Sequence, residues 1–136
     1  MSWVHFLESK SKTFEKFQKF KVMVEKQSDC HIKVLHTDRG EEFVSKEFNL
    51  FCEESCIHRE LTTPCTPKQN GIAECKNRTV VEMARSMLQA RGLSNQFWTE
   101  AIATSVYLLN LSPIRAVMNQ TPYEAWHRRR LSVSHL

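Results

Sequence analysis

The sequence predicts a single α/β domain of 136 residues, and three observations support this. Short runs rich in β-branched and aromatic residues alternate with longer segments whose apolar residues recur at helical spacing. Such alternation of strands and helices is typical of α/β domains. The composition, with 41% hydrophobic and 25% charged residues, is that of an ordinary folded protein. No apolar run approaches the ~18 residues that span a bilayer, so we expect no membrane partner.

The first half of the chain predicts three strands and two helices. These elements lie, in chain order, at residues 3–7, 12–27, 32–36, 45–55 and 57–62. The strands are short and rich in Val, Ile, Phe and Trp, which favour extended backbone. The helix over 12–27 is predicted by Phe14, Phe17 and Phe20, which recur at a spacing of three. A break at Gly40 separates the second strand from the next helix.

The second half predicts a loop followed by helices. Residues 63–71 contain two prolines and an Asn-Gly pair, which indicate a loop. An amphipathic helix is expected over about 71–91, with Gly92 as its stop. A more apolar helix over about 95–110 is expected to be a core element, and a short helical turn over about 121–126 follows it.

Five cysteines are present, and the number is odd. The first twenty residues carry six charged side chains and do not resemble an export signal. Reduced thiols in a nuclear or cytoplasmic protein are therefore the simplest interpretation. Cys52, Cys56 and His58 have a spacing that lacks the second tight pair of a zinc site, so we expect the two cysteines to act as small apolar residues of a helix.

Two carboxylates stand at positions suited to chemistry. Asp38 follows a predicted strand, and ligands of α/β sheets bind outside the carboxyl ends of strands. Glu74 stands at the start of the long helix. Carboxylate oxygens are ligands that Mg²⁺ and Mn²⁺ prefer. The residues alone leave simpler roles open, because Asp38 suits a strand-end turn and Glu74 suits a first helical turn, paired with Arg78.

Three segments of the chain carry recognisable sequence signatures. Residues 37–43 (TDRGEEF) resemble the T-D-N-G-x-E-F signature of retrotransposon integrases, most closely those of copia-type elements. Residues 66–79 (TPKQNGIAECKNRT) resemble its T-P-Q-Q-N-G-V-A-E-R-K-N-R-T signature, and 121–126 (TPYEAW) resemble a later segment. Thirty-five residues separate Asp38 from Glu74, which matches the family's D-35-E spacing.

The resemblance implies an integrase catalytic core of the ribonuclease H superfamily, with a mixed sheet flanked by helices. Such enzymes hold Mg²⁺ or Mn²⁺ between three carboxylates and join DNA by phosphodiester transesterification. By resemblance, Asp38 is the second carboxylate and metal ligand, and Glu74 is the third. The net charge of +4 and pI near 8.9 are compatible with a DNA partner.

The sequence departs from the family at several positions. The family's first Asp lies upstream of the segment matching residues 3–7, so we expect the core to lack its first strand. Arg39 replaces Asn and Glu41 replaces Gly in the first motif. We therefore expect residues 1–126 to be a partial integrase core, followed by a truncated polar tail over 127–136. This polypeptide alone is expected to bind metal weakly and not to cut or join DNA.

DNA contacts are expected, by resemblance, from the 63–71 loop and the helix after it. The candidate DNA-binding residues are Lys68, Gln69, Asn70, Lys76 and Arg78. Helix 95–110 is a candidate surface for a homodimer, with a simple intramolecular core as its alternative. Two rival functions stay open: a host protein that reuses the fragment as a non-catalytic nucleic-acid-binding or dimerisation module, and a nuclease whose missing carboxylate comes from a partner chain.

Overall fold

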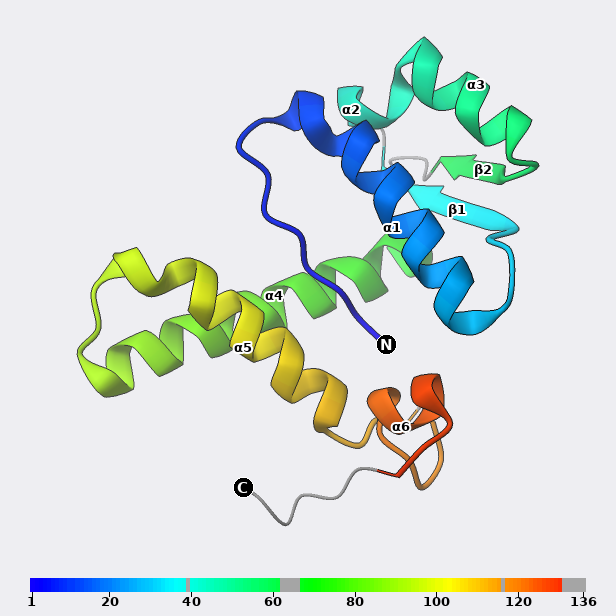
Figure 1. The fold of residues 1–136 in the computed structure, drawn as a ribbon. Coiled ribbons are helices and arrows are strands. Elements are labelled where there is room, and N and C mark those ends of the chain that lie inside the picture. The colour runs from blue at the N-terminus through cyan, green and yellow to red at the C-terminus, as the bar shows by residue number, and fades with distance from the viewer. Residues whose placement is uncertain (39, 62–66, 116, 131–136) are drawn as a thin grey trace. The chain divides into compact units, whose positions relative to one another are not determined.

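The computed structural model describes residues 1–136 except 39, 62–66, 116 and 131–136, and it does not describe the side chains of 67–70 and 72 (Figure 1). The chain divides into two compact units. Unit 1 comprises Met1–Val4 and Cys75–Leu136, and unit 2 comprises His5–Glu74. No helix among the described residues is long and apolar enough to cross a membrane. The predicted domain boundaries stay a prediction.

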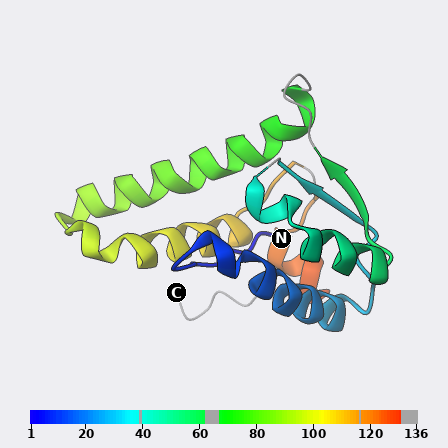
Figure 2. The ribbon, with the colours of Figure 1, turned by 90° about the horizontal axis from the view of Figure 1, so that it is seen from above.

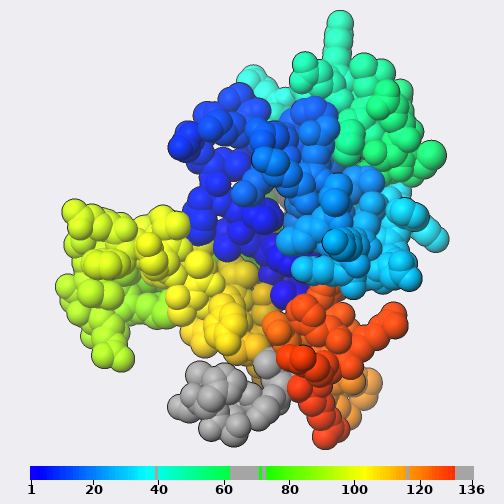
Figure 3. Space-filling model, in the orientation of Figure 1, coloured from blue at the N-terminus to red at the C-terminus, as the bar shows by residue number. Residues whose placement is uncertain are grey.

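Unit 2 combines helices with a small parallel sheet. Its elements are η1 (Lys10–Lys12), α1 (Thr13–Ser28), β1 (Val34–Thr37), α2 (Glu41–Val44), α3 (Lys46–Glu54) and β2 (His58–Leu61). The two strands pair in parallel, with Val34 opposite His58 and Thr37 opposite Leu61. Figures 1 and 2 show α1 and α3 on the same side of this sheet. In the space-filling view of Figure 3, the surfaces of α1 and α3 adjoin.

The core of unit 2 forms around three buried side chains, Phe48, Cys52 and Ile57. Partly buried apolar residues from α1, α2, α3, β1 and the segment before β1 pack against them: Phe14, Phe17, Ile32, Leu35, Phe43 and Phe51. The helices therefore present their aromatic stripes to the sheet, as the spacing of the phenylalanines predicts. Ser45 begins α3 by accepting a hydrogen bond from the Phe48 amide at 3.2 Å, which is a typical N-cap.

Unit 1 is built on a pair of helices. Its elements are the greater part of α4 (Pro67–Arg91), then η2 (Asn95–Phe97), α5 (Trp98–Leu111) and α6 (Pro122–His127). Ala84 and Leu88 of α4 pack on Ala101 and Ile102 of α5, and Figures 1 and 2 show the two helices side by side. Gly92 stops α4 as predicted, since its φ of 59° is in the left-handed region that glycine adopts without strain.

The strand predicted at residues 3–7 does not form. The Asn110 side chain of α5 instead makes two hydrogen bonds with the backbone of Ser2: it accepts from the amide and donates to the carbonyl, both at 2.8 Å. Trp3 meets Trp126 of α6 edge-on, with ring centroids 4.9 Å apart. The N-terminal segment therefore packs on helices α5 and α6, whereas its β-forming composition predicted pairing with another strand.

Three further expectations were wrong in detail. The sheet among the described residues is parallel, not mixed. Helix α4 begins at Pro67, so residues 67–71 are helical and not part of a loop, whereas 62–66 lie outside the described residues. Cys52 is buried in α3 as expected, but Cys56 is exposed in the turn after it. The helices predicted over 12–27, 45–55 and 95–110 are confirmed within a few residues.

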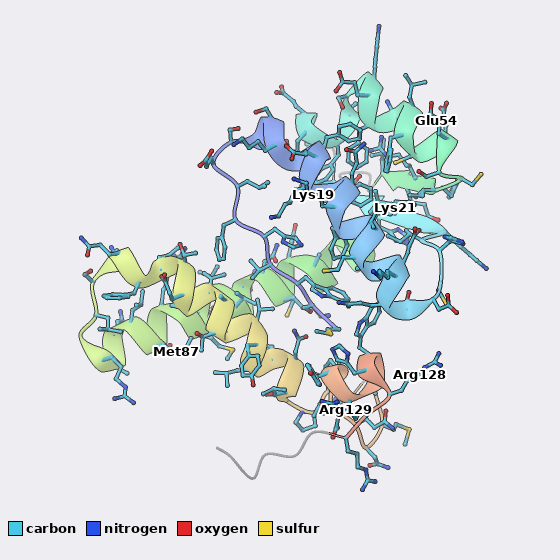
Figure 4. The ribbon with its side chains drawn as sticks, viewed as in Figure 1. Lys19, Lys21, Glu54, Met87, Arg128 and Arg129 are labelled. Carbon is cyan, nitrogen blue, oxygen red and sulfur yellow. The ribbon has the colours of Figure 1, made fainter. Side chains whose placement is uncertain are left out.

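Glu25 joins the end of α1 to the approach of β1. Its carboxylate accepts hydrogen bonds from Lys21 Nζ at 2.8 Å and from the Ile32 amide at 2.9 Å, and His31 Nδ1 lies 3.5 Å away. The ammonium of Lys21, labelled in Figure 4, and then the Ile32 amide lower the Glu25 pKa from its ordinary 4.5 to about 2. The ionised form is therefore the one that the folded state favours.

We expect unit 2 to lose stability as the pH falls from about 4.5 towards 2, because protonation of Glu25 then costs more in the folded than in the unfolded chain. Urea unfolding midpoints of wild type and Glu25→Gln should differ at neutral pH and converge at the acid end of this window. Glu53→Gln, an exposed carboxylate of α3, is the matched control. A parallel pH dependence in wild type and Glu25→Gln would contradict this account.

Candidate active site

Asp38 lies immediately after β1, at the carboxyl end of a parallel strand, and its side chain is exposed. Its Oδ1 accepts a hydrogen bond from the Gly40 amide at 3.2 Å, which closes a tight turn. The turn orients the carboxylate. Within the described residues, Oδ2 has no hydrogen bond and remains available to a ligand. Both simple roles foreseen for Asp38, turn residue and ligand, are therefore compatible.

Gly40 leaves room for the side chain of Glu42. A Cβ at position 40 would lie 2.9 Å from the Glu42 carboxyl carbon, so the acid folds back against the turn that carries Asp38. The Glu42 Oε2 atom is buried and has no hydrogen-bond partner among the described residues, although Lys10 Nζ lies 3.8 Å away. The side chain of a second acid thus lies against the turn that carries Asp38.

Arg59 contacts the last residue of β1, which directly precedes this turn. From β2, its guanidinium donates to Asn49 Oδ1 on α3 and to Thr37 Oγ1 at 3.5 Å. Its Cζ atom lies 5.0 Å from the centroid of the Phe48 ring. Thr37 is the last residue of β1 and directly precedes Asp38, so the arginine connects both strands and α3 at the candidate site.

Glu74 is exposed on α4 and belongs to unit 2, as does Asp38. Within the described residues, no group of three or more His, Cys, Asp and Glu side chains stands close enough to hold a metal ion. Among the described residues, the two candidate carboxylates are exposed, Asp38 in the turn after β1 and Glu74 on α4, but no complete ligand set of protein side chains is present. Two such hard oxygen donors fit a cation that keeps several of its waters, as Mg²⁺ does.

The candidate DNA-binding residues all lie on α4. Lys76 and Arg78 are exposed, follow Glu74 by two and four residues, and fall in unit 1. The side chains of the other three candidates, Lys68, Gln69 and Asn70, lie outside the described residues. Their backbone is helical, so any contacts they make with DNA would start from a helix and not from a loop.

Sequence reasoning missed Arg59 and Glu42. One signal for Arg59 was available: in a strand over 57–62, residues 57, 59 and 61 share one face, so an arginine stands between Ile57 and Leu61. A charge at an apolar-face position requires local partners. For Glu42 the signal was weaker, because only the fold shows that its side chain turns back towards Gly40.

No model of a known protein family matches the sequence. The retrovirus-related Pol polyprotein of transposon TNT 1-94 from Nicotiana tabacum is 42% identical over 134 residues, which make up 98% of this chain. The chain is a homologue of the Pol polyproteins of transposons. The Pol polyprotein of transposon RE1 from Arabidopsis thaliana is 32% identical over 124 residues, or 90% of this chain. The chain spans only 10% and 8% of these two homologues' lengths.

Solved structures give the fold of this Pol homologue. A chain of the simian T-cell lymphotropic virus intasome, solved with a PP2A regulatory subunit, superposes with a TM-score of 0.66 at 17% identity, covering 93% of this chain and 43% of that one. The HTLV-2 integrase catalytic core, in complex with magnesium in a trimeric form, gives 0.62 at 20% identity, covering 89% and 72%. The Pol homologue therefore shares the fold of the HTLV-2 integrase catalytic core over most of its length.

Proposed function

We propose that the chain is the integrase catalytic core segment of a retrotransposon Pol polyprotein, with DNA as its partner. The observation that carries this is the exposed Asp38 carboxylate, held by a turn at the end of a parallel strand, in a chain 42% identical to a transposon Pol polyprotein. Integrase chemistry exchanges one phosphodiester bond for another, and it requires stabilisation of charge on the attacking and leaving oxygens.

In this proposal Asp38 and Glu74 hold Mg²⁺ or Mn²⁺. A bound divalent ion would supply Lewis-acid stabilisation of the phosphoryl oxygens. The contribution of the protein is positional: the Gly40 amide orients the Asp38 carboxylate, and α4 presents Glu74 from a regular element. The support comes from the exposure of both carboxylates and from the magnesium bound by the HTLV-2 core.

We also propose that this polypeptide alone binds metal without joining DNA strands. Its sequence contains two aspartates, Asp38 and Asp29, and Asp29 ends α1 with a left-handed φ of 54°. Asp29 therefore acts as a helix terminator and is no substitute for a third ligand. With two of the three carboxylates that the resemblance implies, the two-metal arrangement is incomplete.

Self-association belongs to the same proposal. Most of the inner face of α5 is buried within unit 1, through Ala101, Ile102, Ser105 and Val106. Tyr107 and Leu108 on its outer face remain 51% and 40% exposed, which leaves apolar area for a second copy. The HTLV-2 core occurs in dimeric and trimeric forms. The buried face of α5 thus belongs to the core of unit 1, and its exposed residues Tyr107 and Leu108 are the candidates for contact with a second copy of the chain.

Metal binding tests the proposed centre. Mn²⁺ titrated into the chain should enhance water-proton relaxation, and Asp38→Asn or Glu74→Gln should weaken the affinity at least about tenfold, since loss of a mere outer-shell partner already costs that much. Glu54→Gln, an exposed carboxylate of α3 labelled in Figure 4, is the matched control and should bind as wild type does. Equal affinities for Asp38→Asn and Glu54→Gln would refute the centre.

DNA binding is tested by its salt dependence. If Lys76 and Arg78 neutralise one phosphate each, replacing both by Gln should reduce the slope of log affinity against log salt by about 1.8, from ~0.9 per phosphate. Fluorescence anisotropy of a labelled duplex between about 50 and 200 mM salt measures this. Lys26→Gln with Lys46→Gln removes two exposed charges of unit 2 as the control. The same slope for both double variants would exclude this role of α4.

A further inference from the structure

Arg59 carries its charge next to the apolar core of unit 2, where a charged side chain requires compensating contacts. It is the second residue of β2 and lies two residues after Ile57, which is 5% exposed and belongs to the core of unit 2. Arg59 is itself only partly exposed, and its Nε atom is buried without a hydrogen-bond partner among the described residues. Burying such a group is unfavourable unless its other contacts compensate.

The contacts of the guanidinium are specific. One amino group donates to Asn49 Oδ1, the other donates to Thr37 Oγ1, and the Cζ atom lies over the fully buried ring of Phe48. In the described part of the chain, no carboxylate stands within salt-bridge distance of Arg59. The arginine is therefore not one half of an ion pair. It acts as a planar fork between α3 and the last residue of β1.

The residue that Arg59 contacts on β1, Thr37, directly precedes the candidate ligand Asp38. Thr37 is the last residue that β1 pairs with β2, and the turn of Asp38 and Gly40 starts directly after it. Strand pairing with β2 fixes the backbone of Thr37 from the β2 side. Arg59 adds a side-chain link from Thr37 to α3, so the start of the turn is held from two directions.

We propose that Arg59 is a positioning residue for the Asp38 metal ligand, acting through Thr37; this assignment rests on the proposed function above. Its chemical role is to hold the strand end rigid, so that the Asp38 carboxylate keeps one orientation towards a divalent cation. Lysine at this position would keep the charge but lose the planar fork, because an ammonium cannot donate in two fixed directions and stack on a ring at once.

The test compares Mn²⁺ affinities of the full chain and its variants. Arg59→Lys and Thr37→Val should each weaken the affinity by about tenfold, the low end of outer-shell effects. Together they should weaken it little more than either alone, because both remove one link. Thr37→Ser keeps the hydroxyl and should restore wild-type binding. His58→Asn, on the opposite face of β2, should leave the affinity unchanged.

The readout separates positioning from general support of the fold. Urea midpoints report stability, and Mn²⁺ broadening of the Asp38 amide signal in a ¹⁵N-labelled chain reports the ligand directly. If Arg59→Lys does not fold, Thr37→Val carries the test alone. Two results would overturn the assignment of Arg59: wild-type affinity in Thr37→Val, or additive losses in the double variant. If Asp38→Asn loses binding in the same experiment, the proposed function still stands. Wild-type binding by Asp38→Asn would overturn both.

Discussion

Burial of the Phe48 ring is the constraint on which unit 2 depends. Phe14 and Phe17 of α1 approach this ring with centroids 5.7 and 5.1 Å away, and Phe43 meets it edge-on at 5.6 Å. Aromatic pairs at such separations add to the hydrophobic gain from the area they bury. Because the Arg59 guanidinium lies over the same ring, the core packing and the contact of Arg59 with the strand end before Asp38 share one aromatic side chain.

The helices could be predicted from the sequence because their signals are local. The spacing of phenylalanines marks α1, and Gly92 marks the end of α4 through a left-handed φ that other residues adopt only with strain. The prediction of a strand at residues 3–7 was wrong, since a strand forms only beside another strand, and the composition of a segment does not specify that partner. Pro67 misled the prediction differently: two prolines and an Asn-Gly pair indicated a loop, yet proline is well tolerated in the first turn of a helix.

The candidate carboxylates could be named from the sequence, but their surroundings could not. Asp38 was a candidate from its place after a strand, and Glu74 from the resemblance to integrases and their D-35-E spacing. Glu42 lies against Gly40 through a local fold of the chain, whereas the contact between Arg59 and Thr37 joins two strands that only the tertiary fold brings together. Sequence periodicity assigns a residue to a face, but it does not say that an arginine on the apolar face reaches a threonine on the next strand.

The central claim is that Asp38 and Glu74 of this Pol homologue bind one divalent cation between them. Crystals of the full chain grown with Mn²⁺ and measured for anomalous scattering test it most directly. The account predicts an anomalous peak with oxygens of both carboxylates in its coordination shell, at the ~2.0–2.2 Å expected of a small divalent cation. A map in which Mn²⁺ occupies other acidic side chains, with Asp38 and Glu74 turned to solvent, would contradict it.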